Sequence, residues 1–537
     1  MKVLIIGGVA GGATAAARLR RLDESAEIIM FERGDYISFA NCGLPYYIGG
    51  EITDKGALTV QTPESFKSRL NIDVRIRETV TAINRKEKTL TVKKSDGSTY
   101  TESYDKLLVT PGAAPVKLPL EGMDAPNVFT LRNIPDTYKI DEFISRNKPK
   151  TAAIIGGGFI GLEMAENLKR RGLEVTVIEA APQIAAVLDE DTVCDLQNYL
   201  VTQGITVKTN VKLNSIGETG CDMVLVSVGV KPESELAVSC GLETGIKGAI
   251  IVDEYLRTSD PDIYAAGDAV QIKNFVTGGD GYVPLAGPAN KQARIAADNI
   301  AGGNSTYKGT QGTSVLKVFG MTAAATGLNE RAAKAGGIPY DKVFLYSANH
   351  ATYYPGAEFM NLKVIFDTTN GRILGAQAVG SGGVDKRIDV LATAIRGGMR
   401  ASDLCDLELA YAPPFSSAKD PVNMAGYVIE NLMTGKVKQI HWHQVDELTG
   451  TPGLQRIDVR PAAAYAGGTI PGAVSVPLTE LRNRLGELDK SRPVYVSCQT
   501  GLNSYIACRI LTGYGFNAVN LAGGYRLYDS VRRAKNN

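Results

Sequence analysis

One cysteine, Cys42, stands without a neighbouring thiol in the segment Ser-Phe-Ala-Asn-Cys-Gly-Leu-Pro-Tyr-Tyr, residues 38–47. The next cysteine along the chain is Cys194, so no second thiol is close enough in sequence to suggest an internal disulfide. If Cys42 is redox-active, its oxidised partner must come from elsewhere, as a small-molecule thiol, a sulfane sulfur or an oxygen atom. A second candidate, Cys498, follows the apolar strand-like run 493–497 and precedes a helix-like segment. Backbone N–H groups in such a loop favour a thiolate and stabilise the terminal sulfur of a persulfide.

The composition excludes several classes of protein. Lys and Arg total 58 against 57 Asp and Glu, which gives no indication of binding to nucleic acid or to a membrane surface. No apolar run is long enough to span a bilayer, and the short apolar start leads into a glycine turn, as a first strand does and a signal peptide does not. Seven scattered cysteines and three histidines, without metal-ligand spacing, predict neither a disulfide framework nor a metal site. We expect a soluble, reduced, cytoplasmic protein in which tyrosine, lysine, carboxylates or a bound cofactor move protons.

The first element expected to position Cys42 is a dinucleotide-binding unit at the N-terminus. An apolar run, 2–6, ends in a glycine-rich turn from Gly7 to Gly12, and a helical stretch, 13–22, follows. The next strand, 27–31, ends at Glu32. Such a turn places a pyrophosphate at a helix N-terminus, and we expect Glu32 to bind a ribose hydroxyl. The turn departs from the usual pattern because Val9 replaces its middle glycine.

The same pattern returns with a complete glycine motif after the strand-like run 152–155. Its glycines are Gly156, Gly158 and Gly161. A second strand, 175–178, ends at Glu179. Two such units imply two dinucleotides, and a flavin with a nicotinamide is the natural pair. Because residues 180–190 contain no Lys or Arg and Glu179 would repel a 2′-phosphate, we predict NADH rather than NADPH.

Residues 258–268 resemble the second FAD fingerprint of the flavoprotein disulfide reductases with two dinucleotide-binding domains. In that family the last residue, here Asp268, binds the ribityl chain of FAD, and Arg33 is assigned to the same FAD site. The single Cys42 separates the chain from the glutathione reductase branch, which has paired cysteines. Ala10 stands where the NADH oxidase and peroxidase group carries a histidine, so peroxide chemistry at the thiol would lack a proton partner.

Five segments resemble the coenzyme A-disulfide reductases, and together they span roughly residues 1–435. The segments are 7–12, 38–47, 282–294, 350–357 and 411–423. The resemblance implies that Cys42 is the nucleophile against the flavin and that two tyrosines of the partner subunit in a homodimer lie over the thiol. Tyr353 and Tyr411 are the best candidates for these two tyrosines, and Tyr354 is the alternative to Tyr353. A phenol there would donate a proton to the leaving thiolate.

Coenzyme A carries phosphates, so its site requires cations near Cys42. Thr14, Arg18 and Arg21 recur at helical spacing on one face of the first helix. The resemblance assigns a coenzyme A site to these residues and four more. The site comprises Thr14, Arg18, Arg21, Ser38, Asn41, Lys67 and Lys419.

Residues of about 446–530 resemble a rhodanese (sulfurtransferase) domain, in which Cys498 would carry a persulfide. Two positions depart from the rhodanese pattern: Asn503 replaces the usual loop arginine, and Thr469 replaces a histidine. Without the arginine of the loop, thiosulfate is a less favoured sulfur donor, because it is an anion. A persulfide donor has less need of a cation in the loop.

These observations predict an α/β protein with two Rossmann-like domains, an α+β dimerisation domain and a C-terminal α/β rhodanese domain. The expected boundaries are 1–110 and 250–312 for the FAD-binding domain, 111–249 for the NADH-binding domain, 313–435 for the dimerisation domain, 436–452 for a linker and 453–537 for the rhodanese domain. Within the dimerisation domain we expect strands at 314–319, 341–346 and 361–367, and a helix around 385–397.

The favoured function is the NADH-dependent, FAD-mediated reduction of coenzyme A persulfide, other small persulfides or polysulfide. Cys42 would release sulfide, and Cys498 would relay the sulfur. The first alternative is a coenzyme A-disulfide reductase with a non-essential rhodanese tail. An NADH oxidase or peroxidase and a redox-sensing scaffold are the others.

Overall fold

The computed structural model describes residues 1–448, 451 and 453–536, which divide into two compact units. The first unit comprises residues 1–182 and 208–312, and the second comprises residues 183–207 and the chain from 313 onward. Within the described residues, no helix is both long enough and apolar enough to cross a membrane.

The N-terminal nucleotide fold is a parallel sheet in the order β15-β7-β1-β2-β3. Its strands are β1 (Lys2–Ile6), β2 (Glu27–Glu32), β3 (Asp73–Ile76), β7 (Lys106–Val109) and β15 (Ile263–Ala265). The small residues of α1 (Ala10–Leu22) and α8 (Ala286–Ile300) pack together with β1 in one apolar core. Because β15 pairs with β7, strands from both predicted FAD-binding segments share one sheet.

Smaller elements complete this fold. Three antiparallel strands form a separate sheet: β4 (Thr79–Asn84), β5 (Thr89–Lys93) and β6 (Thr99–Ser103). The remaining elements are η1 (Asn41–Gly43), α2 (Leu44–Ile48), η2 (Lys55–Leu58), α3 (Pro63–Leu70), η4 (Ile246–Gly248), β16 (Ile272–Lys273) and β17 (Asp280–Gly281).

The second nucleotide fold repeats the first, with β11, β10, β13 and β9 side by side in a parallel sheet. Its elements are β9 (Val128–Phe129), α4 (Ile134–Asn147), β10 (Thr151–Ile155), α5 (Phe159–Arg170), β11 (Glu174–Ile178), η3 (Ile216–Thr219), β13 (Met223–Val226) and α7 (Glu235–Ser239). β12 (Ile205–Lys208) crosses the boundary between the two units. The chain enters and leaves this fold through β8 (Ala113–Pro115) and β14 (Val230–Pro232), which pair antiparallel with each other. The two crossovers between the nucleotide folds are therefore bound together.

The segment predicted to form the dimerisation domain contains an antiparallel sheet in the order β18-β19-β22-β21-β20. Its elements are β18 (Ser314–Val318), β19 (Met321–Gly327), α9 (Glu330–Ala335), β20 (Tyr340–Ala348), β21 (Phe359–Asp367), β22 (Ile373–Gly380), α10 (Val384–Arg396), α11 (Ala401–Asp406) and α12 (Pro421–Met433). Strands β19 and β22 were not predicted, because their sequences are rich in Ala and Gly, which carry little strand propensity. Tertiary packing supplies what propensity does not: β22 is buried along its whole length.

The C-terminal region is a parallel sheet in the order β23-β27-β26-β24-β25. Its elements are β23 (Lys438–Ile440), α13 (Trp442–Glu447), β24 (Gln455–Asp458), α14 (Ala462–Ala466), β25 (Val474–Ser475), η5 (Leu481–Asn483), η6 (Leu485–Glu487), β26 (Val494–Ser497), α15 (Leu502–Gly513), β27 (Ala518–Leu521) and α16 (Gly524–Asn536).

The predicted linker, 436–452, is largely structured where the structure describes it. It contains β23, an edge strand paired with β27, and α13; residues 449, 450 and 452 lie outside the described residues. The sequence of β23 is mostly polar, so it was not predicted to be a strand. An edge strand does not need a continuous apolar run. The segment also contacts β20: Gln439 Nε2 donates to Asp341 Oδ2 at 3.0 Å, and His441 Nε2 lies 2.7 Å from Asp341 Oδ1.

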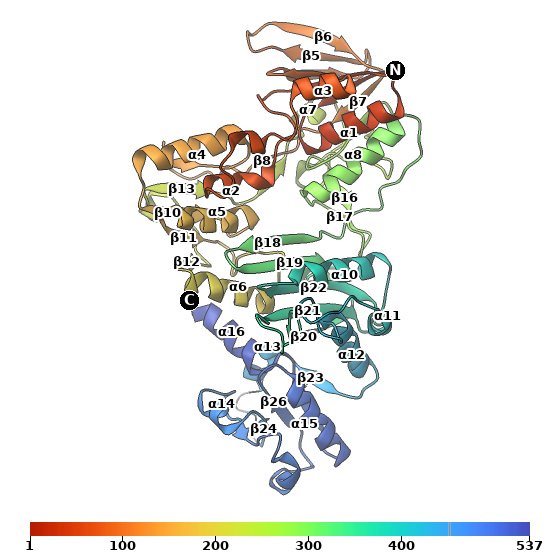
Figure 1. Cartoon of the computed structure of the whole chain (residues 1–537). Coiled ribbons are helices and arrows are strands. Elements are labelled where there is room, and N and C mark those ends of the chain that lie inside the picture. The colour runs from red at the N-terminus through yellow and green to blue at the C-terminus, as the bar shows by residue number, and fades with distance from the viewer. Residues whose placement is uncertain (449–450, 452, 537) are drawn as a thin grey trace. The chain divides into compact units, whose positions relative to one another are not determined.

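Helix α6 (Glu190–Thr202), predicted within the NADH-binding domain 111–249, belongs by its contacts to the second unit. It lies beside α16 (Figure 1), where Gln197 Nε2 donates to Ala534 O at 2.8 Å and Asn198 Nδ2 donates to Ser530 O at 2.9 Å. Tyr346 of β20 donates its hydroxyl to Asp195 Oδ2 at 3.0 Å. Polar contacts made across the sequence, which no local pattern reveals, therefore decide where α6 belongs.

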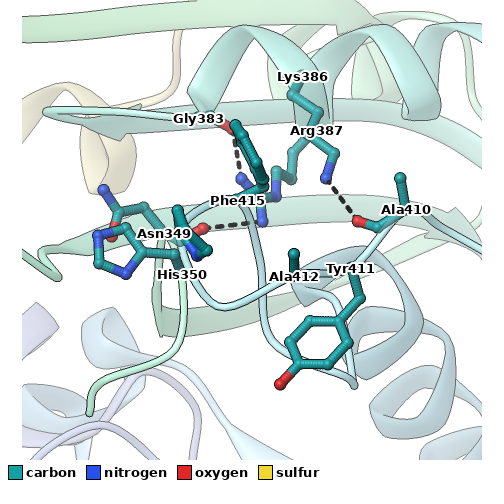
Figure 2. Close-up of a pocket in the computed structure, with 10 residues that line it drawn as sticks. Asn349, His350, Gly383, Lys386, Arg387, Ala410, Tyr411, Ala412 and Phe415 are labelled. Carbon is teal, nitrogen blue, oxygen red and sulfur yellow. Dashed lines mark hydrogen bonds between the residues drawn. The ribbon is translucent and has the colours of Figure 1, made fainter. Parts of the chain in front are cut away.

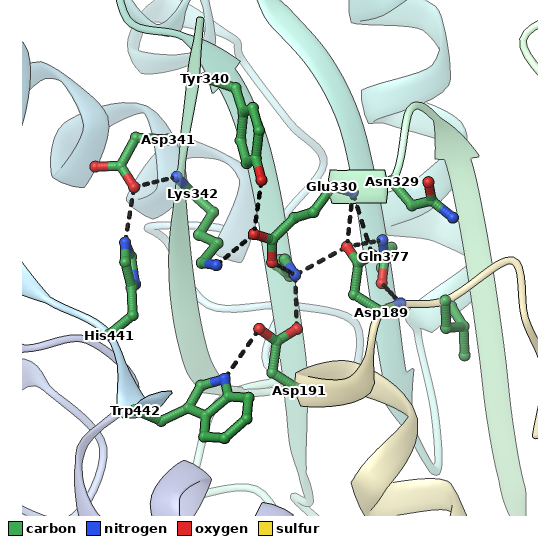
Figure 3. A network of polar contacts seen from close by, with 12 residues as sticks. Asp189, Asp191, Asn329, Glu330, Tyr340, Asp341, Lys342, Gln377, His441 and Trp442 are labelled. Atoms are coloured by element: carbon green, nitrogen blue, oxygen red, sulfur yellow. Dashed lines mark hydrogen bonds and ion pairs between the residues drawn. The ribbon is translucent and has the colours of Figure 1, made fainter. Parts of the chain in front are cut away.

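A buried ionic cluster holds the N-terminal end of α6 (Figure 3). The ammonium of Lys363 lies 2.9 Å from Asp189 Oδ2 and 2.6 Å from Asp191 Oδ1, and it also pairs with Glu330. Trp442 Nε1 donates to the other oxygen of Asp191 at 3.2 Å. The three carboxylates lie close enough together to share a cation, and in this cluster the cation is the Lys363 ammonium.

Candidate functional site

Two glycines of the first turn have no room for a side chain. Gly7 has a φ of +95°, and a Cβ placed on it would lie 2.2 Å from the carbonyl oxygen of Thr110. A Cβ on Gly12 would lie 1.8 Å from the carbonyl oxygen of Gly7. Glu32 closes the turn by accepting the backbone N–H groups of Gly8 at 2.9 Å and Gly34 at 2.8 Å. The turn thus has the close backbone approach that a pyrophosphate requires.

The second turn has the same construction. Gly156 has a φ of +107°, and a Cβ on Gly161 would lie 2.1 Å from the carbonyl oxygen of Gly156. Glu179 accepts the N–H groups of Gly157 and Ala181, each at 2.8 Å. A Cβ on Gly158 would meet no atom within 4 Å, so this glycine borders open space in front of the turn. Both turns therefore fit a dinucleotide.

Two further predicted FAD residues differ in their surroundings. Asp268 is half-buried, and burial raises its pKa to about 6 against the opposing charge of Arg132. Arg33 is exposed and pairs with Glu233 at 2.7 Å, so its charge is largely committed within the protein. Arg132, which sequence reasoning missed, pairs with the same Glu233 at 2.6 Å. The only sequence signal for Arg132 is its position in a loop just before α4.

Cys42 lies in η1, immediately before α2, and its thiol is exposed. The surrounding protein raises the pKa of Cys42, first by desolvation and then through the carboxylates of Glu163 and Asp268. Burial raises the pKa of Glu163 itself to about 7, and Tyr46 donates its hydroxyl to Glu163 Oε1 at 3.3 Å. These groups of the chain therefore disfavour the thiolate form of Cys42. Sequence reasoning missed Glu163, although it lies two residues after Gly161 at the start of α5.

The predicted coenzyme A residues of α1 are partly engaged by α8. Thr14 Oγ1 donates to Asn290 Oδ1 at 2.5 Å, and Arg18 Nε lies 2.6 Å from Asp298 Oδ1. Arg21, one helical turn further on, is exposed at the end of α1. Arg21 is therefore the more accessible of the two arginines.

The other predicted coenzyme A residues lie outside α1. Lys67 Nζ donates to Asn71 Oδ1 at 3.0 Å. The backbone N–H of Ser38 donates to the carbonyl of Gly8 at 2.9 Å, which ties the Cys42 segment to the first glycine turn. Asn41 is exposed in the first unit, and Lys419 is exposed in the second.

The second unit brings Tyr353 and Tyr411 together, with 2.8 Å between their hydroxyl oxygens. Tyr353 is 73% exposed, and the hydrogen bond with Tyr411 raises its pKa, so its phenol keeps its proton at neutral pH. Tyr354 does not join this pair: its ring lies edge-on to His350 with 5.6 Å between the ring centroids. Of the two competing residues, Tyr353 is the one that pairs with Tyr411.

A pocket of about 470 Å³ opens beside Tyr411 (Figure 2). Its lining consists of Asn349, His350, Gly383, Lys386, Arg387, Ala410, Tyr411, Ala412, Pro414 and Phe415. Buried Arg387 supports the walls by donating to the carbonyls of Gly383 at 3.1 Å and Asn349 at 3.0 Å, and it pairs with Asp420 at 3.0 Å. None of the lining residues is acidic. The pocket therefore offers a largely apolar space beside a phenol.

Cys498 lies at the end of β26 and is only 2% exposed. Its sulfur accepts the N–H of Gly501 at 3.1 Å and lies 3.2 Å from the hydroxyl of Ser504. Asn503, which replaces the usual loop arginine, is exposed. Gly501 has a φ of +98°, so the loop requires glycine at this position. One backbone N–H and one side-chain hydroxyl therefore contact the sulfur, where the sequence predicted several backbone N–H groups.

A buried arginine lies beside this loop. Arg460 NH2 lies 2.6 Å from Asp458 Oδ2, and its NH1 donates to Gln499 Oε1 at 3.2 Å. Thr469, in the place of the usual histidine, donates to the same Asp458 oxygen at 2.7 Å. The charge of Arg460 is thus neutralised by a buried carboxylate.

Comparisons with known proteins agree with this architecture. Residues 1–293 match the pyridine nucleotide-disulphide oxidoreductase family, 313–421 match its dimerisation domain, and 441–530 match the rhodanese-like domain. The chain is 38% identical over 443 residues to a coenzyme A disulfide reductase of Staphylococcus haemolyticus. The alignment covers 80% of this chain and 100% of that protein.

Two solved structures resemble the chain along nearly its whole length. One is a reduced Bacillus anthracis CoADR-RHD, with 46% identity, a TM-score of 0.97 and coverage of 99% of this chain and 98% of that one. The other is an NAD-dependent persulfide reductase from A. fulgidus, with 39% identity, a TM-score of 0.92 and coverage of 98% and 100%. The chain therefore belongs to the pyridine nucleotide-disulphide oxidoreductase family and combines a region similar to coenzyme A disulfide reductases with a C-terminal rhodanese-like domain.

Proposed function

We propose that this oxidoreductase uses NADH and FAD to reduce coenzyme A persulfide, other small persulfides or polysulfide to sulfide, as a homodimer. The observation that carries the proposal is the presence of two different thiols in one chain: exposed Cys42 without a second cysteine, and Cys498 in a backbone cradle. The names of the relatives support the same chemistry, since one is a disulfide reductase and another is a persulfide reductase.

In the proposed reaction, the Cys42 thiolate attacks the inner sulfur of coenzyme A persulfide. A Cys42–coenzyme A disulfide forms, and the bond to the outer sulfur breaks, so that the outer sulfur leaves as hydrosulfide. The two glycine turns would hold the dinucleotides, and a bound flavin would pass an electron pair from NADH to the mixed disulfide. Coenzyme A then leaves as a thiolate and takes up a proton. In sum, one persulfide, one NADH and one proton yield one coenzyme A thiol, one hydrogen sulfide and NAD⁺.

Tyr353 and Tyr411 of one subunit are proposed to supply the proton to the thiolate that leaves Cys42 of the other subunit. Their hydroxyls share a hydrogen bond, so the phenol that loses its proton is stabilised by its neighbour. The chain has only three histidines, and a tyrosine pair provides the acid that histidine supplies elsewhere. The apolar pocket beside Tyr411 gives an uncharged part of the substrate room near this pair.

The coenzyme A phosphates are proposed to bind the cationic residues around the Cys42 segment. Arg21 is exposed, whereas Arg18 already pairs with Asp298, so Arg21 is the stronger candidate for a phosphate. Ser38, Asn41, Lys67 and Thr14 would complete the site in the same unit, and Lys419 would come from the second unit.

Cys498 is proposed to accept a sulfane sulfur and to pass it to coenzyme A. In the outward step, the coenzyme A thiolate attacks the outer sulfur of the Cys498 persulfide, and Cys498 leaves as a thiolate. This step produces the coenzyme A persulfide that Cys42 then reduces. The NADH preference is proposed from Glu179, whose carboxylate is held at the end of β11 by two backbone N–H groups.

Steady-state measurement of sulfide release with NADH tests the proposal. We expect kcat/KM for coenzyme A persulfide to exceed that for coenzyme A disulfide, and Cys42→Ser to abolish sulfide release. Equal or higher rates on coenzyme A disulfide, together with no effect of Cys498→Ala, would instead support a coenzyme A disulfide reductase with a non-essential tail. The similarity to the Staphylococcus haemolyticus protein favours this second candidate.

A further inference from the structure

Two backbone hydrogen bonds join the loop that carries Cys498 to the start of α16. The backbone N–H of Tyr525 donates to the carbonyl of Cys498 at 2.8 Å, and that of Arg526 donates to the carbonyl of Gln499 at 2.9 Å. Gly524 permits this approach, because a Cβ on it would lie 2.6 Å from the Cys498 carbonyl oxygen. The positions of the groups around the sulfur are therefore set before any substrate arrives.

One of those groups is the hydroxyl of Ser504, a residue with 0% exposure. Its oxygen lies 3.2 Å from Cys498 Sγ and 3.1 Å from the carbonyl oxygen of Gly501. A serine hydroxyl has one proton, so it can donate to only one of these acceptors at a time. The Gly501 carbonyl also accepts the N–H of Tyr505 at 3.1 Å and the amide of Asn520 at 3.4 Å. That carbonyl stays satisfied when the Ser504 proton turns to the sulfur.

The loop around the sulfur is electrically neutral. Residues 498–504 contain no charged side chain, and Asn503 occupies the position of the usual arginine. The neighbouring guanidinium of Arg460 is paired with buried Asp458 and also donates to the carbonyl of Gly468 at 2.6 Å. Negative charge on Cys498 Sγ therefore meets two neutral donors, the Gly501 N–H and the Ser504 hydroxyl.

We propose that Ser504 is a catalytic residue of the sulfur transfer: its hydroxyl hydrogen-bonds the Cys498 thiolate, and this neutral cradle selects persulfide donors over thiosulfate. In the inward step, the Cys498 thiolate attacks the outer sulfur of a persulfide. A new bond joins Cys498 to that sulfur, the original sulfur–sulfur bond breaks, and the donor leaves as a thiolate. With thiosulfate the group that leaves is sulfite, a dianion, and no free cation of the loop is available to stabilise it.

This inference rests on the proposed role of Cys498 as a sulfur carrier. Its test compares Ser504→Ala with Ser497→Ala in the full-length protein. Ser497 is a matched control, since it is also buried but donates to the carbonyl of Ile457 at 3.3 Å. The probe is coenzyme A persulfide, and rapid quenching with mass spectrometry follows the persulfide on Cys498.

We expect Ser504→Ala to slow persulfide formation at least about tenfold, the effect of losing one hydrogen bond to a charged group. The midpoint of the pH profile for alkylation of Cys498 should move to higher pH in the same variant. Ser497→Ala should change neither quantity. Equal rates and equal pH profiles for the two variants would overturn the role of Ser504. Failure of Cys498 to acquire sulfur in the unmodified protein would instead refute the carrier role itself.

The selectivity is tested by restoring a loop cation with Asn503→Arg and using thiosulfate as the probe. We expect thiosulfate to load Cys498 at least about tenfold faster in this variant than in the unmodified protein, because a nearby cation stabilises the departing sulfite. Efficient loading from thiosulfate in the unmodified protein would overturn the selectivity. So would an unchanged rate in Asn503→Arg.

Discussion

Replacing Lys363 with methionine should destabilise the second unit strongly. Lys363 has 0% exposure, and its ammonium is the cation among Asp189, Asp191 and Glu330. Methionine fills a similar volume but leaves Asp189 and Asp191 without their cation, while Lys342 still pairs with Glu330. Because breaking a buried ion pair from one side leaves an uncompensated charge, the free energy of unfolding should fall by about 3–5 kcal/mol.

The titration of Glu330 sets an upper limit to the share of this loss that comes from Glu330. Burial alone would raise the pKa of Glu330, but the charges of Lys363 and Lys342 outweigh it and lower the pKa from 4.5 to about 2. At about 1.4 kcal/mol for each pKa unit, this change corresponds to about 3 kcal/mol, which Lys363 and Lys342 contribute together. The contribution is present above pH 4.5, where the unfolded carboxyl is ionised, and it is lost as the pH falls toward 2. The difference between Lys363→Met and the unmodified protein should therefore shrink on acidification.

Urea unfolding followed by tryptophan fluorescence measures the change in the free energy of unfolding with a probe that lies in the ionic cluster. Trp442 is the single tryptophan of the chain, and its indole donates to Asp191 in the same cluster. Lys317→Met is the control, since Lys317 is exposed on β18 and its loss should change the free energy of unfolding by no more than about 0.5 kcal/mol. A loss below about 1 kcal/mol in Lys363→Met at neutral pH would refute the reasoning, as would a difference that grows on acidification.

Three further predictions concern the proposed chemistry. Tyr411→Phe should lower turnover of coenzyme A persulfide about 10²-fold by removing one phenol of the proton-donating pair, whereas Tyr354→Phe should have little effect; equal losses would contradict the assignment. Glu163→Gln should lower the pKa of the Cys42 thiol, because the Glu163 carboxylate helps to raise it, and should speed alkylation of Cys42 severalfold just above neutral pH; an unchanged pH profile would show that the Glu163 carboxylate does not contribute to that pKa. Ala180→Arg should raise kcat/KM for NADPH at least about tenfold by placing a cation near the 2′-phosphate, and NADPH preferred by the unmodified protein would overturn the NADH prediction.

Local sequence was sufficient where local chemistry decides the structure. The two glycine turns are examples, because no side chain fits at Gly7, Gly12, Gly156 or Gly161. The cradle of Cys498 was also predictable, since a strand, a glycine-containing loop and a helix follow one another directly.

Features that depend on contacts between distant residues were not predictable. Glu163 influences Cys42 only because α2 and α5 meet in the fold, as the hydrogen bond from Tyr46 shows. Helix α6 lies with the second unit because Lys363 and α16 bind it, and neither can be inferred from the sequence of α6. The pairing of Tyr353 with Tyr411 also joins residues 58 positions apart, so only the structure reveals it.

The central claim is that a small sulfur carrier takes the place of a second cysteine at Cys42. Mass spectrometry of the protein after addition of coenzyme A persulfide, first without and then with NADH, tests it most directly. We predict a coenzyme A disulfide on Cys42 and one extra sulfur on Cys498 before NADH is added, with both lost and sulfide released afterwards. A Cys42 that carries only oxygen, or that never acquires coenzyme A, would contradict the account.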